Sequence, residues 1–134
     1  MATERVLLCS VITPEQKVFE AEATAVVMPA HDGKVGILRG RAPLLCELGT
    51  GTLRVDAVNQ GEREFYVDGG FAQVLENRVT ILTERAIAAE NISRADAEKA
   101  LAEARQMKNF GVEEVQARKK AMDRARAQLH LARK

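Results

Sequence analysis

The stretch of sequence that says most about the fold runs Gly33-Lys34-Val35-Gly36-Ile37-Leu38-Arg39-Gly40-Arg41-Ala42-Pro43-Leu44. Its glycines permit positive φ angles and close approach of the chain. Pro43 fixes its own φ and favours an extended Ala42. The pattern predicts a tightly folded connection between strands. It contains no Ser, Cys, Asp or Glu that could act as a nucleophile or metal ligand, so it indicates a contact surface.

On both sides of this stretch, the first two thirds of the chain has the sequence pattern of short β-strands. Leu53 and Val55 alternate with Arg54, which is the period of a half-buried strand. Strands are predicted at 5–12, 18–19, 23–28, 53–57, 64–67, 71–75 and 78–83, with Pro29 ending the third. Turn signals between them favour an antiparallel sandwich or barrel.

From Ser93 onward the chain is rich in Ala, Glu, Lys and Arg and contains no proline. Ser93 followed by Asp96 predicts a helix N-cap, and Gly111 predicts a left-handed end to that helix. A second helix is expected from Val112, antiparallel to the first. Ala97, Leu101, Ala104 and Lys108 follow helical spacing in the first helix. In the second, the seam is predicted at Val115, Met122, Ala125, Leu129 and Ala132. An alanine-rich seam packs weakly, and hairpin mobility is a hypothesis.

Charge divides the 134 residues unevenly. Residues 1–92 carry nine Lys/Arg and thirteen Asp/Glu, a net charge of −4, while residues 93–134 carry eleven and six, a net charge of +5. This asymmetry of charge has two interpretations. Either the two parts of the chain have differently solvated faces, or the basic segment docks on an acidic partner. Aromatic residues are only 4% of the chain, which disfavours base stacking on single-stranded nucleic acid.

Catalytic and metal-binding patterns are missing from the sequence. It has no Gly-x-Ser-x-Gly turn and no P-loop. His31 and His130 have no second ligand at metal spacing, and Glu62 with Glu64 is interpreted as a solvated edge. Cys9 and Cys46 are expected to be reduced thiols. No apolar run approaches the length of a membrane span, and no targeting segment is recognised before the first strand.

Four blocks in order carry a family resemblance. They are Val11-Ile12-Thr13-Pro14-Glu15 with Phe19, the 33–44 stretch, Val67-x-Gly69-Gly70-Phe71, and Val79-Thr80-Ile81-Leu82. With these blocks the chain resembles the epsilon-subunit family of bacterial F-type ATP synthases over essentially its full length. The resemblance implies a ten-stranded antiparallel β-sandwich in residues 1–88 and a helical hairpin in residues 89–134.

The resemblance also implies a function. The chain would be a non-catalytic rotor subunit that joins the gamma subunit to the c-ring at the cytoplasmic face of the bacterial inner membrane. It would contact the membrane only through the complex. Its hairpin would extend to the alpha and beta subunits and inhibit ATP hydrolysis.

Three groups of residues are assigned roles by the resemblance. Contact with the c-ring is expected at Asp32, Lys34, Arg39 and Arg41, although many relatives have Pro-Gly-His in place of Arg39-Gly40-Arg41 and an acidic residue in place of Lys34. Inhibitory contact with beta is expected at Arg118, Lys119, Lys120, Arg124 and Arg126, opposed by Glu113, Glu114 and Asp123.

The third group is a degenerate nucleotide segment. Some relatives bind ATP through Ile-Asp-x-x-Arg-Ala, and the matching positions here are Ile92, Ser93, Asp96 and Ala97. The Asp and the Arg are both replaced, so no bound cofactor is expected. Two other readings remain: a scaffold whose basic helix docks on nucleic acid, which mixed helix charges disfavour, and a small enzyme with an unrecognised site.

Overall fold

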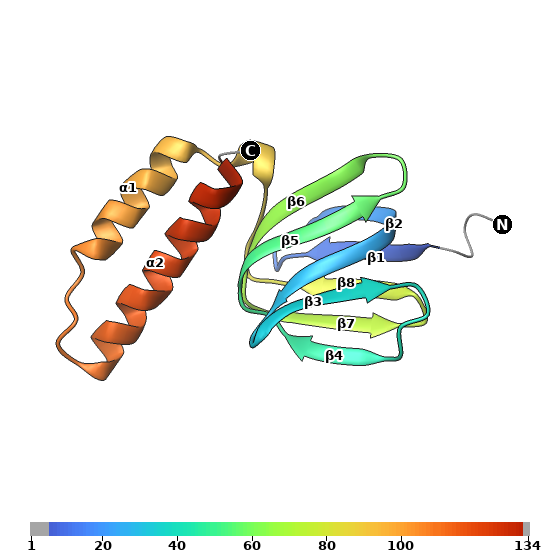
Figure 1. Cartoon of the computed structure of the whole chain (residues 1–134), viewed down its shortest axis with the longest axis horizontal. Coiled ribbons are helices and arrows are strands. Elements are labelled where there is room, and N and C mark those ends of the chain that lie inside the picture. The colour runs from blue at the N-terminus through green and yellow to red at the C-terminus, as the bar shows by residue number, and fades with distance from the viewer. Residues whose placement is uncertain (1–5, 133–134) are drawn as a thin grey trace.

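Nine strands occur in residues 6–132, the part of the chain that the computed structural model describes. The strands are β1 (Leu7–Ile12), β2 (Lys17–Ala30), β3 (Gly33–Leu38), β4 (Leu44–Glu47), β5 (Thr50–Ala57), β6 (Gly61–Asp68), β7 (Phe71–Leu75), β8 (Arg78–Leu82) and β9 (Ala86–Ala88). A 3-10 turn, η2 (Ala89–Asn91), leads to the helices α1 (Arg94–Arg105) and α2 (Val112–Ala132). A β-sandwich followed by a two-helix hairpin is therefore confirmed (Figure 1).

Strand β2 connects the two layers of the sandwich. The hydrogen-bonded order is β4-β7-β8-β1-β2-β5-β6-β9, with β3 pairing to β2 outside this path. The first part of β2 pairs with β1, and its later part pairs with β3 and β5. One continuous strand of 14 residues thus belongs to both layers.

The predicted strand count is wrong by one, because nine strands are found among the described residues where ten were expected. The two segments predicted at 18–19 and 23–28 form the single strand β2, which continues through Pro29. Pairing with β5 has already ended at Val27, so proline's missing N–H interrupts no bond of that ladder, and the Pro29 carbonyl accepts from the N–H of Gly49 at 2.7 Å. Arg5, the predicted first strand residue, lies outside the described residues.

The arrangement is also not wholly antiparallel. Strands β1 and β8 pair in parallel, with Cys9 opposite Val79. Parallel neighbours need a long connection, and the whole chain between β1 and β8 supplies it here. All the other pairs of named strands described are antiparallel.

The 33–44 stretch is only partly a connection. Its first half forms β3, because Ile37 is buried while its neighbours in the stretch face outward, and the true connection is residues 39–43. Gly33 (φ 139°) and Gly40 (φ 83°) use the left-handed freedom of glycine, one at each end of β3.

The core lies between the two layers and consists of fully buried aliphatic and aromatic side chains. Alternate residues of each strand contribute to it, for example Leu7, Cys9 and Val11 of β1. Strand β6 departs from this pattern, because Phe65, Tyr66 and Val67 are consecutive and all buried. Side chains on a strand alternate between faces, so β6 is covered on both faces at this point.

The helix start was predicted correctly and the helix end was not. The backbone N–H of Asp96 donates to Oγ of Ser93 at 3.2 Å, which is the predicted N-cap. Helix α1 ends at Arg105 on a right-handed cap at Gln106, so Lys108 lies beyond the helix. Gly111 does not have a positive φ. Its carbonyl instead accepts from the N–H of Val115 at 2.9 Å, which begins α2.

The two helices lie side by side, and α2 is the one next to the sandwich (Figure 1). The buried residues of the hairpin are Ala97, Leu101, Ala104, Ala125 and Leu131. Val115 of the predicted seam is 48% exposed, and Leu131 was not predicted. No helix in the described part of the chain has the length and apolar character to cross a bilayer.

Candidate interaction surfaces

Residues 6–132 contain no group of three or more His, Cys, Asp or Glu side chains placed to hold a metal ion. The features that stand out are instead three exposed surfaces and one internal contact. The surfaces are the free edge of β3, an apolar face of the sandwich and the cationic side chains of α2, and the contact is the one between α2 and the sheet.

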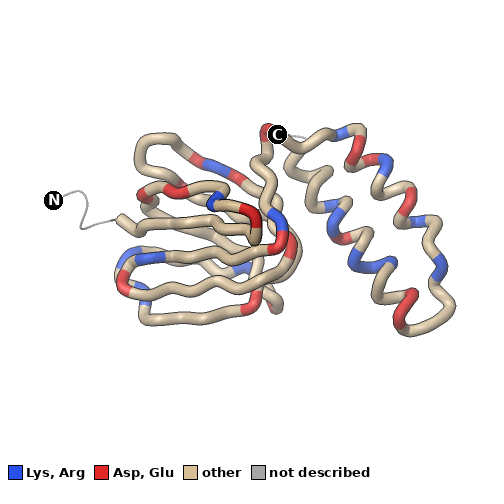
Figure 2. The backbone as a smooth tube through the Cα atoms, turned by 180° about the vertical axis from the view of Figure 1, so that it is seen from behind, with Lys and Arg blue, Asp and Glu red and all other residues tan. Residues whose placement is uncertain are grey.

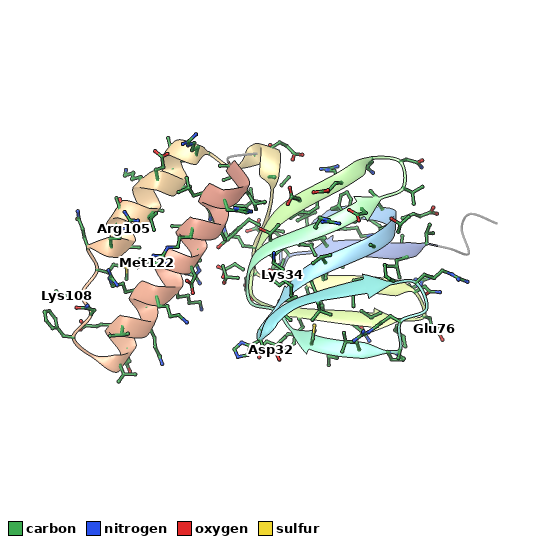
Figure 3. The ribbon with its side chains drawn as sticks, viewed as in Figure 1. Asp32, Lys34, Glu76, Arg105, Lys108 and Met122 are labelled. Carbon is green, nitrogen blue, oxygen red and sulfur yellow. The ribbon has the colours of Figure 1, made fainter. Side chains whose placement is uncertain are left out.

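The four residues predicted to contact the c-ring lie at the two ends of β3. Asp32 and Lys34 are at the end near α2, whereas Glu76 is at the opposite end of the sandwich (Figure 3). The N–H of Gly40 donates to Oδ1 of Asn77 at 2.8 Å, which places the Arg39–Arg41 turn beside Glu76. Lys34 and Arg39 are five residues apart on an extended chain, roughly 17 Å.

These four residues therefore do not form one loop. Asp32 and Lys34 lie at the start of the six-residue strand β3 and Arg39 and Arg41 lie beyond its end, which the interpretation of 33–44 as a connection missed. Strand β3 pairs only with β2, so its other edge is unpaired among the described strands. The four side chains mark the two ends of this edge.

An apolar face covers the outer side of the layer formed by β4, β7 and β8. Leu45 is 71% exposed and Phe71 is 54% exposed, and both lie on neighbouring antiparallel strands. Leu82 lies directly opposite Phe71 across the ladder between β7 and β8, and Leu75 completes the set on β7. Several large exposed apolar side chains on one face are typical of a protein-binding surface.

The cationic residues predicted on α2 face in several directions. Figure 2 shows basic and acidic positions along both helices. The Arg118 guanidinium donates to the Arg105 carbonyl at 3.3 Å, so this side chain points back to α1. Lys119 is exposed, and Lys120 and Arg124 line a cavity against the sandwich. The five side chains do not form one face.

Arg124 contacts the sandwich. Its Nε lies 2.9 Å from Oδ2 of Asp68, at ion-pair distance although not oriented as a hydrogen bond. The other carboxylate oxygen, Oδ1, accepts from the Thr50 hydroxyl at 2.9 Å. The Asp68 side chain is only 12% exposed. Asp68 was not identified from the sequence, because no local pattern reveals a partner 56 residues away.

Tyr66 lies beside this ion pair and was also missed. It is fully buried, and it points away from the sandwich core because its neighbours Phe65 and Val67 point into it. Burial raises the pKa of its hydroxyl, the Asp68 charge adds to this, and Gln128 and Arg124 on α2 lower it. The side chain therefore lies between the sheet and α2.

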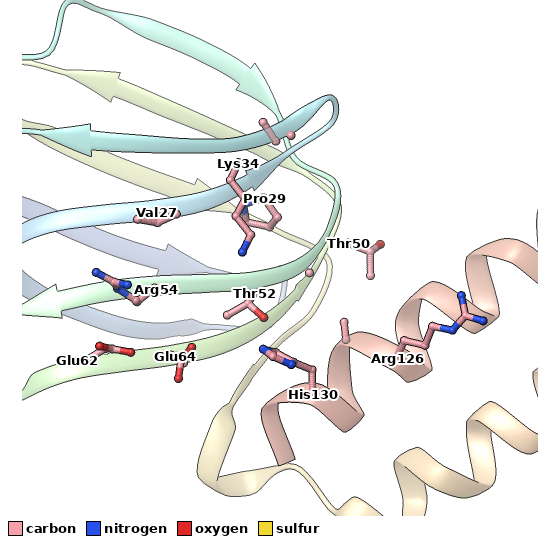
Figure 4. Close-up of a pocket in the computed structure, with 14 residues that line it drawn as sticks. Val27, Pro29, Lys34, Thr50, Thr52, Arg54, Glu62, Glu64, Arg126 and His130 are labelled. Atoms are coloured by element: carbon pink, nitrogen blue, oxygen red, sulfur yellow. The ribbon is translucent and has the colours of Figure 1, made fainter. Parts of the chain in front are cut away.

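A cavity of about 590 Å³ opens next to this contact, between α2 and the outer face of β2, β5 and β6. His130 reaches toward Thr52 and Glu64, while Lys34 extends from the β3 side (Figure 4). Arg54 at its border is engaged with Asp56 through two contacts of 3.2 Å. The lining carries both signs of charge, and Glu62 and Glu64 form part of it.

The degenerate nucleotide segment is occupied by structural contacts. Ser93 caps α1, and Ala97 is buried in the hairpin seam. Arg94 pairs with Glu98 one helical turn later, with Nε and Oε1 3.0 Å apart. Ile92 precedes the cap and is half-buried, and Asp96 is exposed.

Comparison with known proteins gives consistent matches. The family described as ATP synthase, Delta/Epsilon chain, beta-sandwich domain matches residues 6–89. The ATP synthase epsilon chain of Rhodopirellula baltica is 44% identical over 125 residues, covering 93% of this chain and 97% of that one. The epsilon chain of a Synechococcus strain is 38% identical over 90% of this chain and 88% of its own.

Two solved structures share the fold. One is a chain in the Euglena gracilis mitochondrial ATP synthase structure described as OSCP/F1/c-ring, with a TM-score of 0.84 and 22% identity, covering 97% of this chain and 82% of that one. The other is in the Tetrahymena thermophila mitochondrial ATP synthase central stalk/c-ring, with a TM-score of 0.72 and 15% identity, covering 92% and 94%.

The family match, the full-length relatives and the order of sandwich and hairpin agree with one another. The protein is thus a subunit of a larger complex and not itself the catalyst. The chain belongs to the ATP synthase delta/epsilon family.

Proposed function

We propose that this chain is a rotor subunit of the central stalk of a bacterial F-type ATP synthase. Residues 1–88 would join the gamma subunit to the c-ring, and residues 89–134 would regulate ATP hydrolysis. The subunit would lie at the cytoplasmic face of the inner membrane, held there by the complex. The similarity to bacterial epsilon chains over most of their length supports this role.

The observation that carries the proposal is the apolar face of Leu45, Phe71, Leu75 and Leu82. Four large apolar side chains on one face, each between 44% and 71% exposed, are an unfavourable surface for a chain that works alone. We assign this face to the gamma subunit. Complete burial of a side chain of this size contributes roughly 1.5–3 kcal/mol, so covering this face with a partner is favourable.

Co-purification with gamma tests this assignment. Phe71→Asp places a charge in the middle of the apolar face, and we expect it to abolish recovery of the gamma complex. Val58→Asp is the matched control, because Val58 is also exposed, at 42%, but lies in the turn between β5 and β6. Equal recovery of gamma with both variants would contradict the assignment.

The free edge of β3 is proposed as the c-ring contact. Lys34 at one end and Arg41 at the other would meet polar loops of different c subunits, since they are too far apart for one loop. Reversing either charge should weaken association with the c-ring, and reversing both should weaken it further. Cysteine can be placed at Lys34 or at Arg41 and tested for crosslinking to the c-ring. Crosslinking from position 34 alone would limit the contact to that end of β3.

The cations of α2 are proposed to regulate hydrolysis by meeting acidic surface on the beta subunit, with alpha nearby, after the hairpin leaves the sandwich. Charge contacts of this kind supply orientation and specificity more than affinity. Reversal of Arg118, Lys119 and Lys120 to Glu should raise the ATPase activity of the assembled enzyme. Lys99→Glu on α1 is the control, and unchanged activity in the triple variant with normal assembly would contradict the inhibitory contact.

A further inference from the structure

We propose that the ion pair between Asp68 and Arg124 is the latch that holds the hairpin on the sandwich, and that its loss releases α2 from the sheet. Thr50 positions the carboxylate for this pair. The inference deepens the proposed regulatory role and rests on that role for its biological meaning, but the latch can be tested in the isolated chain.

The contact between α2 and the sheet is narrow. Two cavities border it: one of about 590 Å³ has Arg126, Ala127 and His130 of α2 in its wall, and one of about 480 Å³ has Lys120 and Arg124. Within α2 only Ala125 and Leu131 are buried among the described residues. Leu131 is thus the one large apolar side chain that the described part of α2 buries, so polar contacts with the sheet contribute to docking alongside the packing of Tyr66.

The carboxylate of Asp68 is held in place by contacts within the sandwich. Thr50 donates to Oδ1 from the neighbouring strand, and the backbone N–H of Asp68 is shared between Oγ1 of Thr83 and the carbonyl of Arg85. With the side chain 12% exposed, Asp68 depends on Arg124 for charge compensation. A buried charge left without its partner is strongly unfavourable, so removal of Arg124 favours departure of α2 and hydration of the carboxylate.

Tyr66 gives a direct readout of docking. It is the single tyrosine of a chain that has no tryptophan, and it lies fully buried between β6 and α2. Its absorbance and fluorescence therefore report on this contact without background.

The sign of the change in the Tyr66 pKa separates release from mere loss of charge. The Arg124 cation lowers the pKa of Tyr66, whereas burial raises it. Loss of Arg124 from a hairpin that stays docked would therefore raise the pKa further. Loss of Arg124 with release of α2 would hydrate the phenol and lower the pKa toward the ordinary tyrosine value of about 10.

The experiment is an ultraviolet titration of Tyr66 in the full chain, with acrylamide quenching of tyrosine fluorescence at pH 7 in parallel. We expect Arg124→Gln to lower the pKa of Tyr66 and to raise the quenching constant severalfold. Lys119→Gln removes the same charge from an exposed position of α2 and should change neither. An unchanged or raised pKa with unchanged quenching in Arg124→Gln would overturn the latch.

Asp68→Asn provides the reciprocal variant, since the amide keeps the shape and can still accept from Thr50. Greater quenching in this variant supports the latch, and wild-type quenching overturns it. Because neither measurement involves other subunits, failure here leaves the rotor assignment standing. Failure to recover gamma would remove the rotor assignment without affecting the latch.

Discussion

The sandwich and the hairpin of this chain are stabilised in different ways. The sandwich encloses large side chains such as Leu53, Phe65 and Ile81, all essentially inaccessible to water. The described part of the hairpin buries only two leucines, Leu101 and Leu131, and otherwise the small side chains of Ala97, Ala104 and Ala125. A buried methyl group contributes about 0.8 kcal/mol, against roughly 1.5–3 kcal/mol for a whole leucine side chain. One chain thus joins a strongly stabilised platform to a weakly stabilised appendage.

This difference in packing indicates which region of the chain can open at a low cost in free energy. Regions with few buried apolar contacts open first, at free energies well below that of global unfolding. The hairpin satisfies this description and the sandwich does not. The following substitutions test whether the two regions are as unequal as their packing indicates.

The largest effect is expected from Gly70→Ala. Gly70 has φ 107°, and a Cβ there would overlap the backbone carbonyl of Leu82 on β8. The neighbouring Gly69 has φ 71° and open space around the Cβ position. Gly70→Ala should lower the free energy of unfolding by more than about 4 kcal/mol, and Gly69→Ala by about 1–2 kcal/mol. Denaturant titration that found the two variants equal would contradict the close approach.

The next comparison truncates one leucine in each region. Leu53→Ala in the sandwich core should lower the global free energy of unfolding by about 2–5 kcal/mol. Leu101→Ala in the hairpin should accelerate hydrogen exchange within 94–132 while exchange in the strands stays as in the wild type. Equal loss of strand protection in both variants would show that the regions unfold as one unit.

A pH effect is expected from the core thiol. Burial raises the pKa of Cys9 to about 12, from an ordinary 9.0. The unfolded chain therefore loses this proton near pH 9 while the folded chain keeps it, so stability is lost as pH rises between 9 and 12. By pH 10 the wild type should lose about 1.4 kcal/mol relative to its own value at pH 7, and Cys9→Ala should lack this component. Parallel pH profiles for the two proteins would contradict it.

The smallest effect concerns the start of α1. Ser93→Ala removes the acceptor for the Asp96 N–H and should destabilise the hairpin by about 1 kcal/mol. Circular dichroism on heating should show loss of the helical signal at a lower temperature than in the wild type, while the sheet unfolds at the same temperature. Ser10→Ala on β1 serves as the control, because its hydroxyl bonds only to the exposed Glu20.

Local signals in the sequence predicted much of this architecture. Alternating residues located β5 and β8, turn residues before Phe71 located β7, and Ser93 with Asp96 located the start of α1, because each signal lies within a few residues of the element it specifies. The joined strand β2 and the parallel pairing of β1 with β8 were not predicted, because both depend on partners distant in sequence.

The surfaces were harder to predict than the fold. The charges of Lys34 and Arg41 are apparent in the sequence, but their separation by β3 is not. Arg124 was recognised as a cation, while its pairing with Asp68 requires two segments 56 residues apart to meet. Long-range contacts of this kind arise from the packing of whole elements, which a single sequence does not encode in any local pattern.

The unbroken strand β2 has a mechanical consequence. Two sheets that contact each other only through apolar side chains can slide past one another when a shear force acts on one of them. Here the backbone of β2 runs through both sheets and is hydrogen-bonded to β1 in one and to β3 and β5 in the other. Sliding would have to rupture a whole row of hydrogen bonds together, so a twisting force applied to one sheet reaches the other with little slack.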